Sequence, residues 1–143
     1  MNAYIDTSAL AKCYIREPRS LEVLDWAEVQ GETATAALTL VEFRCLLARR
    51  RRAGDIDATL ERMALAEFDS HVRSGAWRIH HGSFGDFATA RDLIDTLPNH
   101  PLRTLDALHL AAARAIGADS FATADKIQAE AATALGFTVH RFF

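Results

Sequence analysis

Four acidic residues, far apart in the chain, could act together in catalysis. Each follows or opens a short motif, and they are Asp6 in Tyr4-Ile5-Asp6-Thr7-Ser8, Glu42 in Leu40-Val41-Glu42-Phe43, Asp106 in Asp106-Ala107-Leu108-His109 and Asp125 in Thr123-Ala124-Asp125. Carboxylates crowded in a poorly solvated cleft raise one another's pKa unless a cation neutralises them. Oxygen ligands of this kind suit Mg²⁺ or Mn²⁺. Proteins use these ions to activate water for phosphodiester hydrolysis.

Each acid also has a purely structural explanation. Asp6 could cap a helix, Thr39-x-x-Glu42 matches a capping box, and Asp106 and Asp125 could offset the positive end of a helix dipole. Asp6 and Glu42, however, have apolar neighbours that would leave them partly desolvated. This combination favours a shared functional site.

The elements that must position these acids are separated by glycines. Gly31, Gly75, Gly117 and Gly136 each end a helix-period segment just before a short apolar run, as helix C-terminal glycines do. The predicted strands are 3–5, 33–37, 77–80, 119–122 and 137–140, and the predicted helices are 8–15, 18–30, 39–53, 56–74, 84–97, 104–116 and 125–135. Pro18 is placed in the first turn of its helix, and Asp55 is expected to cap the fourth.

Strands that alternate with helices, without hairpin dipeptides, predict an α/β fold. We expect a three-layer α/β/α sandwich around a mostly parallel sheet of about five strands. In such a sheet the strand-to-helix junctions open on one edge, where ligands bind. The four acids lie at or soon after such junctions, which predicts that they face one cleft.

Composition bounds the protein class. The chain has 143 residues, 50% of them hydrophobic, and a net charge of -3, which predicts one domain over residues 1–143. No segment is apolar enough to cross a membrane, and the N-terminal residues lack a signal-peptide pattern, so a cytoplasmic protein is expected. Cys13 and Cys45 are predicted to be buried free thiols, and Phe84 and Phe87 to face the core.

Taken together, the four acidic motifs resemble the PIN-domain ribonucleases, and most closely the VapC toxins of bacterial toxin–antitoxin pairs. The resemblance extends over nearly the whole chain and implies a PIN-like fold. It also implies that Asp6, Glu42, Asp106 and Asp125 occupy the four acidic positions that hold one or two Mg²⁺ or Mn²⁺ ions and activate the attacking water.

The function implied by this resemblance is a metal-dependent endoribonuclease that inhibits translation or growth. It further implies a homodimer and a cognate VapB-like antitoxin that occupies the cleft and supplies an arginine to the carboxylates. A structured RNA with an exposed loop, such as tRNA or ribosomal RNA, is the expected substrate class.

Several residues could support the acids. Thr7 and Ser8 could orient Asp6 or cap the first helix, and Thr123 matches a family position that holds the site by hydrogen bonds. His109, one helical turn after Asp106, could be a general acid or a packed, hydrogen-bonded side chain.

Arginines are the candidate RNA contacts. Arg103 precedes the Asp106 helix and could bind phosphate. The run formed by Arg49, Arg50, Arg51 and Arg52 could guide an RNA backbone, or could simply complement a helix C-terminus.

Three other functions stay open at this point. The protein could be a solitary PIN ribonuclease without an antitoxin, or a non-catalytic module that binds RNA through its arginine run. It could also be an aspartyl-phosphate phosphatase with Asp6 as nucleophile. Those phosphatases are expected to carry a second acid two residues later, where this chain has Ser8.

Overall fold

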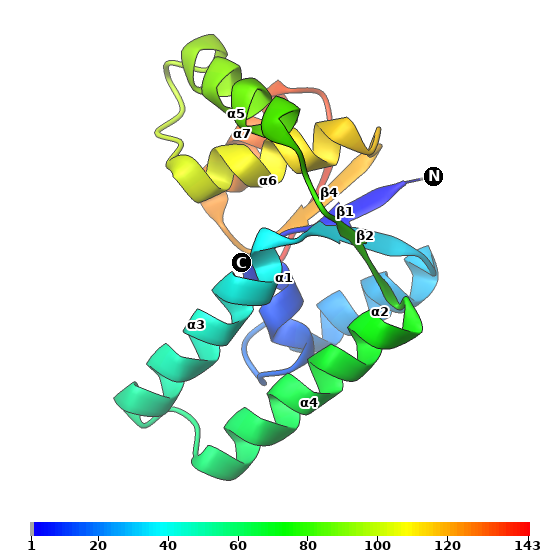
Figure 1. Cartoon of the computed structure of the whole chain (residues 1–143), viewed down its shortest axis with the longest axis vertical. Helices are drawn as coiled ribbons and strands as arrows, with labels where there is room; N and C mark the ends of the chain where they lie inside the picture. Colours follow the sequence, from blue (N-terminus) through cyan, green and yellow to red (C-terminus); the bar gives the residue numbers. More distant parts are fainter. Residues whose placement is uncertain (1) are drawn as a thin grey trace.

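The computed structural model describes residues 2–143 and contains one five-stranded sheet. The strands are β1 (Ala3–Ile5), β2 (Thr33–Ala36), β3 (Trp77–His80), β4 (Ser120–Thr123) and β5 (Thr138–Arg141). Their order across the sheet is β3-β2-β1-β4-β5, and every described pair is parallel. β1 is therefore the central strand, flanked by β2 and β4 (Figure 1).

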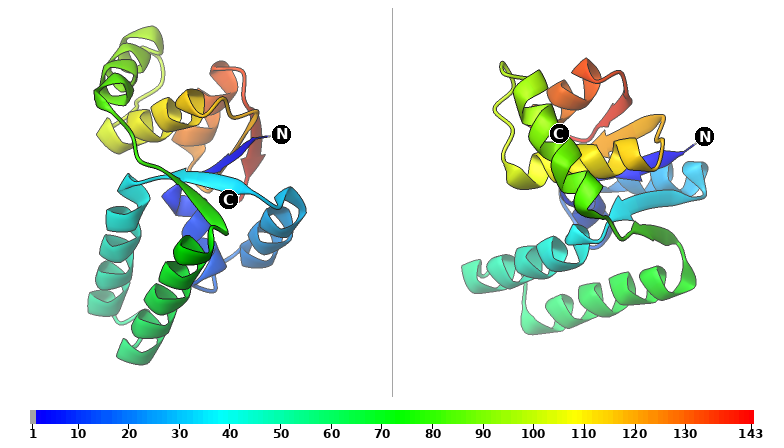
Figure 2. Two further views of the ribbon diagram at one scale, coloured as in Figure 1. Left: turned by 45° about the vertical axis from the view of Figure 1, so that its right-hand side comes forward. Right: turned by 45° about the horizontal axis from the view of Figure 1, so that its top comes forward.

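Helices lie on both faces of this sheet (Figures 1 and 2). They are α1 (Thr7–Leu10), the 3₁₀ segment η1 (Ala11–Cys13), α2 (Ser20–Gln30), α3 (Leu38–Ala53), α4 (Ala58–Ser74), α5 (Phe84–Thr96), α6 (Thr104–Ala115) and α7 (Lys126–Ala134). The helices α3 and α4 form an antiparallel pair that projects away from α5 and α6 (Figure 1). The predicted three-layer α/β fold is confirmed.

The side-chain alternation of β1 and β4 divides the interior into two cores. Tyr4 pairs in register with Phe121 and stacks on it, with ring centroids 5.2 Å apart, in the core beneath α5, α6 and α7. The next pair, Ile5 and Ala122, belongs to the core beneath α1 to α4. Neighbouring residues of a strand point to opposite faces, so a strand buried on both faces is apolar throughout.

Two strands begin one residue later than predicted. The amide of Ala118, which follows Gly117, donates to Ala113 O at 3.0 Å, and the amide of Phe137, after Gly136, donates to Ala132 O at 3.1 Å. These bonds belong to the motif that ends each helix, with the glycine at positive φ. The residue after each glycine therefore still belongs to the helix end, which accounts for the later start of β5. At β4 the residue left out of the strand is Asp119, one position further along.

Several local predictions were wrong. The first helix is one short α turn followed by η1, Pro18 lies outside α2, and Asp57 rather than Asp55 caps α4 by accepting from Leu60 N at 2.8 Å. Cys13 is half-buried but Cys45 is exposed, although both are free thiols.

The aromatic residues of α5 were also misplaced by the sequence pattern. Phe84 is 87% and Phe87 62% exposed, so neither belongs to the core. Across residues 2–143, no helix is long and apolar enough to cross a membrane.

Candidate active site

All four predicted acids line one cavity of about 520 Å³ at the carboxyl edge of the sheet. Asp6 follows β1, Glu42 lies in the second turn of α3 after β2, Asp125 caps α7 after β4, and Asp106 lies in the first turn of α6. The segments of Asp6, Glu42 and Asp125 meet at one pocket because their strands β1, β2 and β4 are parallel and adjacent. Asp106 reaches the same pocket from the start of α6, which follows α5 rather than a strand. We refer to it below as the acid pocket.

Asp6 is the most buried of the four acids, at 3% exposure. Its Oδ1 accepts from Ser8 Oγ at 2.6 Å and from Ala9 N at 3.1 Å, and its Oδ2 accepts from Thr123 Oγ1 at 2.5 Å. Burial raises the pKa of Asp6 despite these bonds and despite the electrostatic influence of His109. The carboxylate therefore lacks full charge compensation from the protein.

Glu42 is held by two donors on the same oxygen. Thr7 Oγ1 donates to Oε1 at 2.8 Å, and His109 Nε2 lies 2.6 Å from the same atom. Burial raises the pKa of Glu42, but His109 and Thr7 together outweigh it and lower the pKa below its usual value. The predicted Thr39-x-x-Glu42 capping box is absent, since Ala37 is the N-cap of α3 and Thr39 contacts Thr7 and Thr35 instead.

Asp106 and Asp125 each have one oxygen engaged by the backbone. Oδ2 of Asp106 accepts from Arg103 N at 3.1 Å, and Oδ1 of Asp125 accepts from Gln128 N at 3.0 Å. These are the helix-start contacts that the structural explanation of the two acids anticipated. Such a contact occupies only one carboxylate oxygen, so it is compatible with a second role.

Within residues 2–143, no three acidic, histidine or cysteine side chains are arranged as the ligands of one ion. The donor chemistry nevertheless fits a hard divalent cation, because the pocket collects carboxylate oxygens. Among the described hydrogen bonds, none reaches Glu42 Oε2, Asp106 Oδ1 or Asp125 Oδ2. Three of the four acids thus keep one oxygen available.

Gln128 is a polar pocket residue that the sequence analysis did not consider. Gln128 is 1% exposed and lines the acid pocket, yet its Oε1 has no hydrogen-bond partner among the described residues. A buried amide oxygen without a donor is costly and indicates a ligand or water at that position. Nothing in the motif around Asp125 could have revealed this, since a glutamine in the first turn of a helix is usually solvated.

The predicted arginines are divided by the fold. Arg49 and Arg103 line the acid pocket, whereas Arg51 and Arg52 are exposed beyond it. Arg50 is paired with Glu17 and does not line the pocket. The continuous arginine run is therefore not one surface at the site.

The predicted supporting residues all reach the acids. Thr7 and Ser8 line the pocket, and Thr123 lies behind Asp6. Ser8 Oγ also accepts from Ala124 N at 2.9 Å, and Thr123 Oγ1 accepts from Asp125 N at 3.0 Å. The Ser8–Ala124 bond and the Thr123–Asp6 bond tie the segment after β1 to the end of β4 and the loop that follows it.

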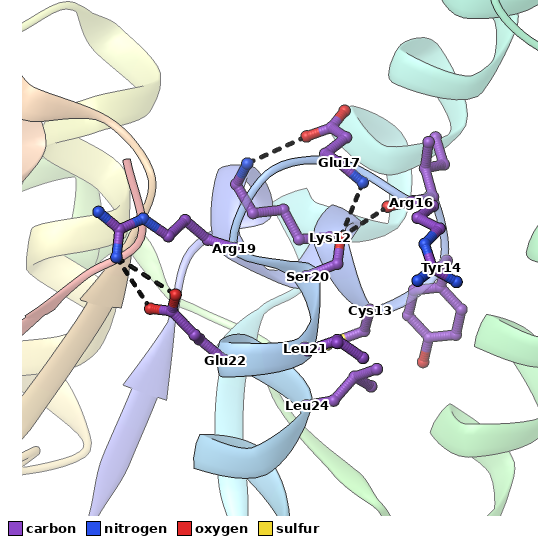
Figure 3. A pocket seen from close by; sticks show the side chains of 11 residues that line it. Lys12, Cys13, Tyr14, Arg16, Glu17, Arg19, Ser20, Leu21, Glu22 and Leu24 are labelled. Atoms are coloured by element: carbon purple, nitrogen blue, oxygen red, sulfur yellow. Dashed lines mark hydrogen bonds and ion pairs between the residues drawn. The ribbon is translucent and has the colours of Figure 1, made fainter.

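A second cavity, of about 420 Å³, lies between η1 and α2 and differs in its charge (Figure 3). Its acids are already paired: Glu17 lies 3.2 Å from Lys12 and also contacts Arg50, and Glu22 lies 3.1 Å from Arg19. A cavity whose carboxylates are compensated has no need of a cation. The acid pocket is therefore the better candidate for catalysis.

The fold and the acid pocket define a class of protein: an α/β sandwich with a carboxylate-lined pocket at the carboxyl edge of its sheet. The chain belongs to the PIN-domain family, whose model matches residues 3–134. It is 32% identical, over 148 residues, to ribonuclease VapC35 of Mycobacterium tuberculosis, and the alignment covers 95% of this chain and 93% of that protein.

Two solved structures share the fold. Mycobacterium tuberculosis VapC20, described as a toxin that cleaves the sarcin–ricin loop, superimposes with a TM-score of 0.70 at 21% identity, over 95% of this chain and 96% of that one. VapBC2 of Rickettsia felis, solved with a DNA fragment from its promoter, gives a TM-score of 0.68 at 12% identity, with both chains fully covered.

Proposed function

We propose that this protein is a metal-dependent endoribonuclease toxin that hydrolyses RNA phosphodiester bonds and is neutralised by a cognate antitoxin. The observation that carries the proposal is the convergence of Asp6, Glu42, Asp106 and Asp125 on the acid pocket. The 32% sequence identity of this chain to ribonuclease VapC35 supports the same activity.

The four acids would hold one or two Mg²⁺ or Mn²⁺ ions. When bound, such an ion supplies an activated water and stabilises charge on the attacking and leaving oxygens. Asp6 would contribute its buried carboxylate, and Glu42, Asp106 and Asp125 would contribute their free oxygens. Ser8 and Thr123 hold Asp6 in place by donating to both of its oxygens.

Arg49 and Arg103 would contact the phosphates of the RNA. Both line the acid pocket, and a guanidinium at its rim offsets the repulsion that an acidic cleft exerts on a polyanion. Arg51 and Arg52 are exposed on the same helix and would contribute only to long-range attraction. Arg50 is engaged by Glu17 and is left out of this role.

A structured RNA with an exposed loop is the proposed substrate class, for example tRNA or ribosomal RNA, and the cytoplasm is the proposed location. An open pocket of about 520 Å³ admits a splayed nucleotide segment more readily than a duplex. The likeness in fold to a toxin that cleaves an RNA loop supports this class of substrate.

The proposed partners are a VapB-like antitoxin and a second copy of the chain. The antitoxin would place an arginine against the carboxylates and so compete with the metal, because a guanidinium can compensate the same charge. The second copy would cover the apolar side of α5, where Phe84 and Phe87 are exposed.

The test combines cleavage and growth. Purified protein with Mn²⁺ should nick tRNA or ribosomal RNA, and its expression should arrest bacterial growth. Asp6→Asn, Asp106→Asn and EDTA should each abolish cleavage while the protein stays folded, as judged by circular dichroism. Full activity in EDTA would refute the role of the metal, and growth arrest that a co-expressed antitoxin fails to relieve would favour a solitary nuclease.

The other two alternatives give different results in the same assay. A non-catalytic RNA-binding module would retain RNA without cleaving it and would be insensitive to Asp6→Asn. An aspartyl-phosphate phosphatase would form a covalent phosphate on Asp6. The position where that mechanism needs a second acid is occupied by Ser8, whose hydroxyl donates a hydrogen bond to Asp6.

A further inference from the structure

His109 connects a candidate metal-holding acid to the buried core. Its Nε2 lies 2.6 Å from Glu42 Oε1, and its Nδ1 lies 2.6 Å from the hydroxyl of Tyr4. Tyr4 is fully buried in β1, and His109 is 3% exposed in α6. Three separate elements, β1, α6 and α3, therefore contribute one residue each to an unbroken chain of hydrogen bonds.

The partners determine which ring nitrogen carries the proton. A carboxylate only accepts, so Nε2 of His109 must be the donor to Glu42. The hydroxyl of Tyr4 is the partner of Nδ1, the other ring nitrogen. Both ring nitrogens are therefore engaged, and the ring of His109 is oriented from both sides.

The ring of Tyr4 is itself fixed by packing. It stacks on Phe121 at 5.2 Å between ring centroids and meets His109 edge-on at 5.9 Å. The hydroxyl that orients His109 thus stands on a rigid part of the core, beside the central strand.

From this geometry we infer that Tyr4 and His109 are positioning residues that fix the side chain of Glu42 through Oε1 and leave Oε2 free to hold a metal ion. The inference rests on the proposed function, in which Glu42 is a metal-holding acid. Partners that orient a metal-binding side chain in this way commonly change metal affinity by about 10–100-fold when removed.

The protein contains a matched control for the hydrogen bonds that join Tyr4, His109 and Glu42, which we call the relay. Tyr14 Oη lies 2.6 Å from His71 Nδ1, the same pairing as between Tyr4 and His109. That pair lies in the other core, and no described hydrogen bond joins His71 to a carboxylate. Trp77 Nε1 also donates to Tyr14 Oη at 2.6 Å, so removing that hydroxyl disturbs at least as many bonds.

The experiment measures Mn²⁺ binding to the full chain by electron paramagnetic resonance of free Mn²⁺, without RNA. We expect His109→Leu to raise the dissociation constant about 10–100-fold. His109→Gln, whose amide can still donate to Glu42, should stay within a few-fold of wild type. Tyr4→Phe should weaken binding by less than His109→Leu, and Tyr14→Phe should leave it unchanged. Cleavage should follow the same order in the Mn²⁺ concentration needed for half-maximal rate.

Nitrogen-15 spectra of the wild type show directly whether Nε2 of His109 carries a proton, even if His109→Leu fails to fold. An unprotonated Nε2 would overturn the inference, and so would wild-type Mn²⁺ affinity in both His109→Leu and Tyr4→Phe. An equal loss of Mn²⁺ affinity in Tyr14→Phe would show that the relay variants act only by lowering the stability of the protein, and would overturn the inference. Asp6→Asn separates the two levels: if it abolishes Mn²⁺ binding while the relay variants do not alter it, the relay alone is wrong. If Asp6→Asn changes neither binding nor cleavage, the proposed function itself fails.

Discussion

Thr123 Oγ1 donates a 2.5 Å hydrogen bond to Asp6 Oδ2, across 117 residues of sequence. The same hydroxyl oxygen accepts from the amide of Asp125 at 3.0 Å. Thr123, at the end of β4, thus contacts both the carboxylate of Asp6 and the backbone of Asp125. The adjacency of β1 and β4 in the sheet makes this link possible.

Two substitutions of Thr123 distinguish the effect of its hydroxyl from the effect of its side-chain volume. Thr123→Val should reduce the cleavage rate by about tenfold or more, because Asp6 loses the donor to Oδ2 in a buried setting. Thr123→Ser should retain most of the rate. Single-turnover cleavage at saturating Mn²⁺ measures both, with Thr96→Val, at an exposed position of α5, as the control. Equal rates in the valine and serine variants would contradict the assignment.

Without metal, the charge of Asp6 should cost stability. Burial raises its pKa, so the ionised form is disfavoured in the folded chain at neutral pH. We expect Asp6→Asn in EDTA to have a higher Tm than wild type, by roughly 2–4 °C for each 1 kcal/mol gained. Added Mn²⁺ should raise the Tm of the wild type, because the ion binds the folded state alone. It should not raise the Tm of Asp6→Asn, because that variant lacks the carboxylate that would hold the ion. Equal Mn²⁺-induced shifts in both proteins would argue against Asp6 as a ligand.

Arg49 and Arg52 give a matched pair on α3. Arg49 lines the acid pocket, and Arg52 is exposed outside it. Arg49→Ala should raise the KM for RNA about tenfold and lower the slope of log affinity against log salt by about one unit. Arg52→Ala should change KM by much less. A larger effect at Arg52 would relocate the RNA path to the end of the helix.

His140 makes the stability depend on pH. Burial lowers its pKa below the unfolded value of 6.5, so below that pH the unfolded chain binds more protons and stability falls as pH decreases. His140→Gln should therefore lose less Tm than wild type between about pH 7 and about pH 5. His81→Gln, at an exposed position, is the control. Parallel Tm profiles for wild type and His140→Gln would refute the assignment.

The apolar face of α5 should mediate self-association. Phe87→Glu places a charge where we propose that a second copy docks. Light scattering after size exclusion should give the mass of two chains for wild type and about 15.8 kDa for the variant. A monomeric wild type would remove the proposed dimer without affecting the nuclease proposal.

The sequence by itself determined the α/β class, the five strands and the four acids as candidates. Glycines at helix ends, apolar strands and acids at strand-to-helix junctions are local signals, because each depends on a few neighbouring residues. The same signals misplaced Phe84 and Phe87, since an apolar side chain carries no mark of whether another element will cover it.

Only the tertiary structure decided how the acids are held. The strand order places β1 between β2 and β4, and this brings Thr7 to Glu42 and Thr123 to Asp6. It also decided that His109 is a hydrogen-bonded side chain that contacts Glu42 and Tyr4. Of the four consecutive arginines, it placed only Arg49 at the acid pocket. Such contacts join residues tens of positions apart, so no local pattern encodes them and the packing of the sheet alone selects the pairs.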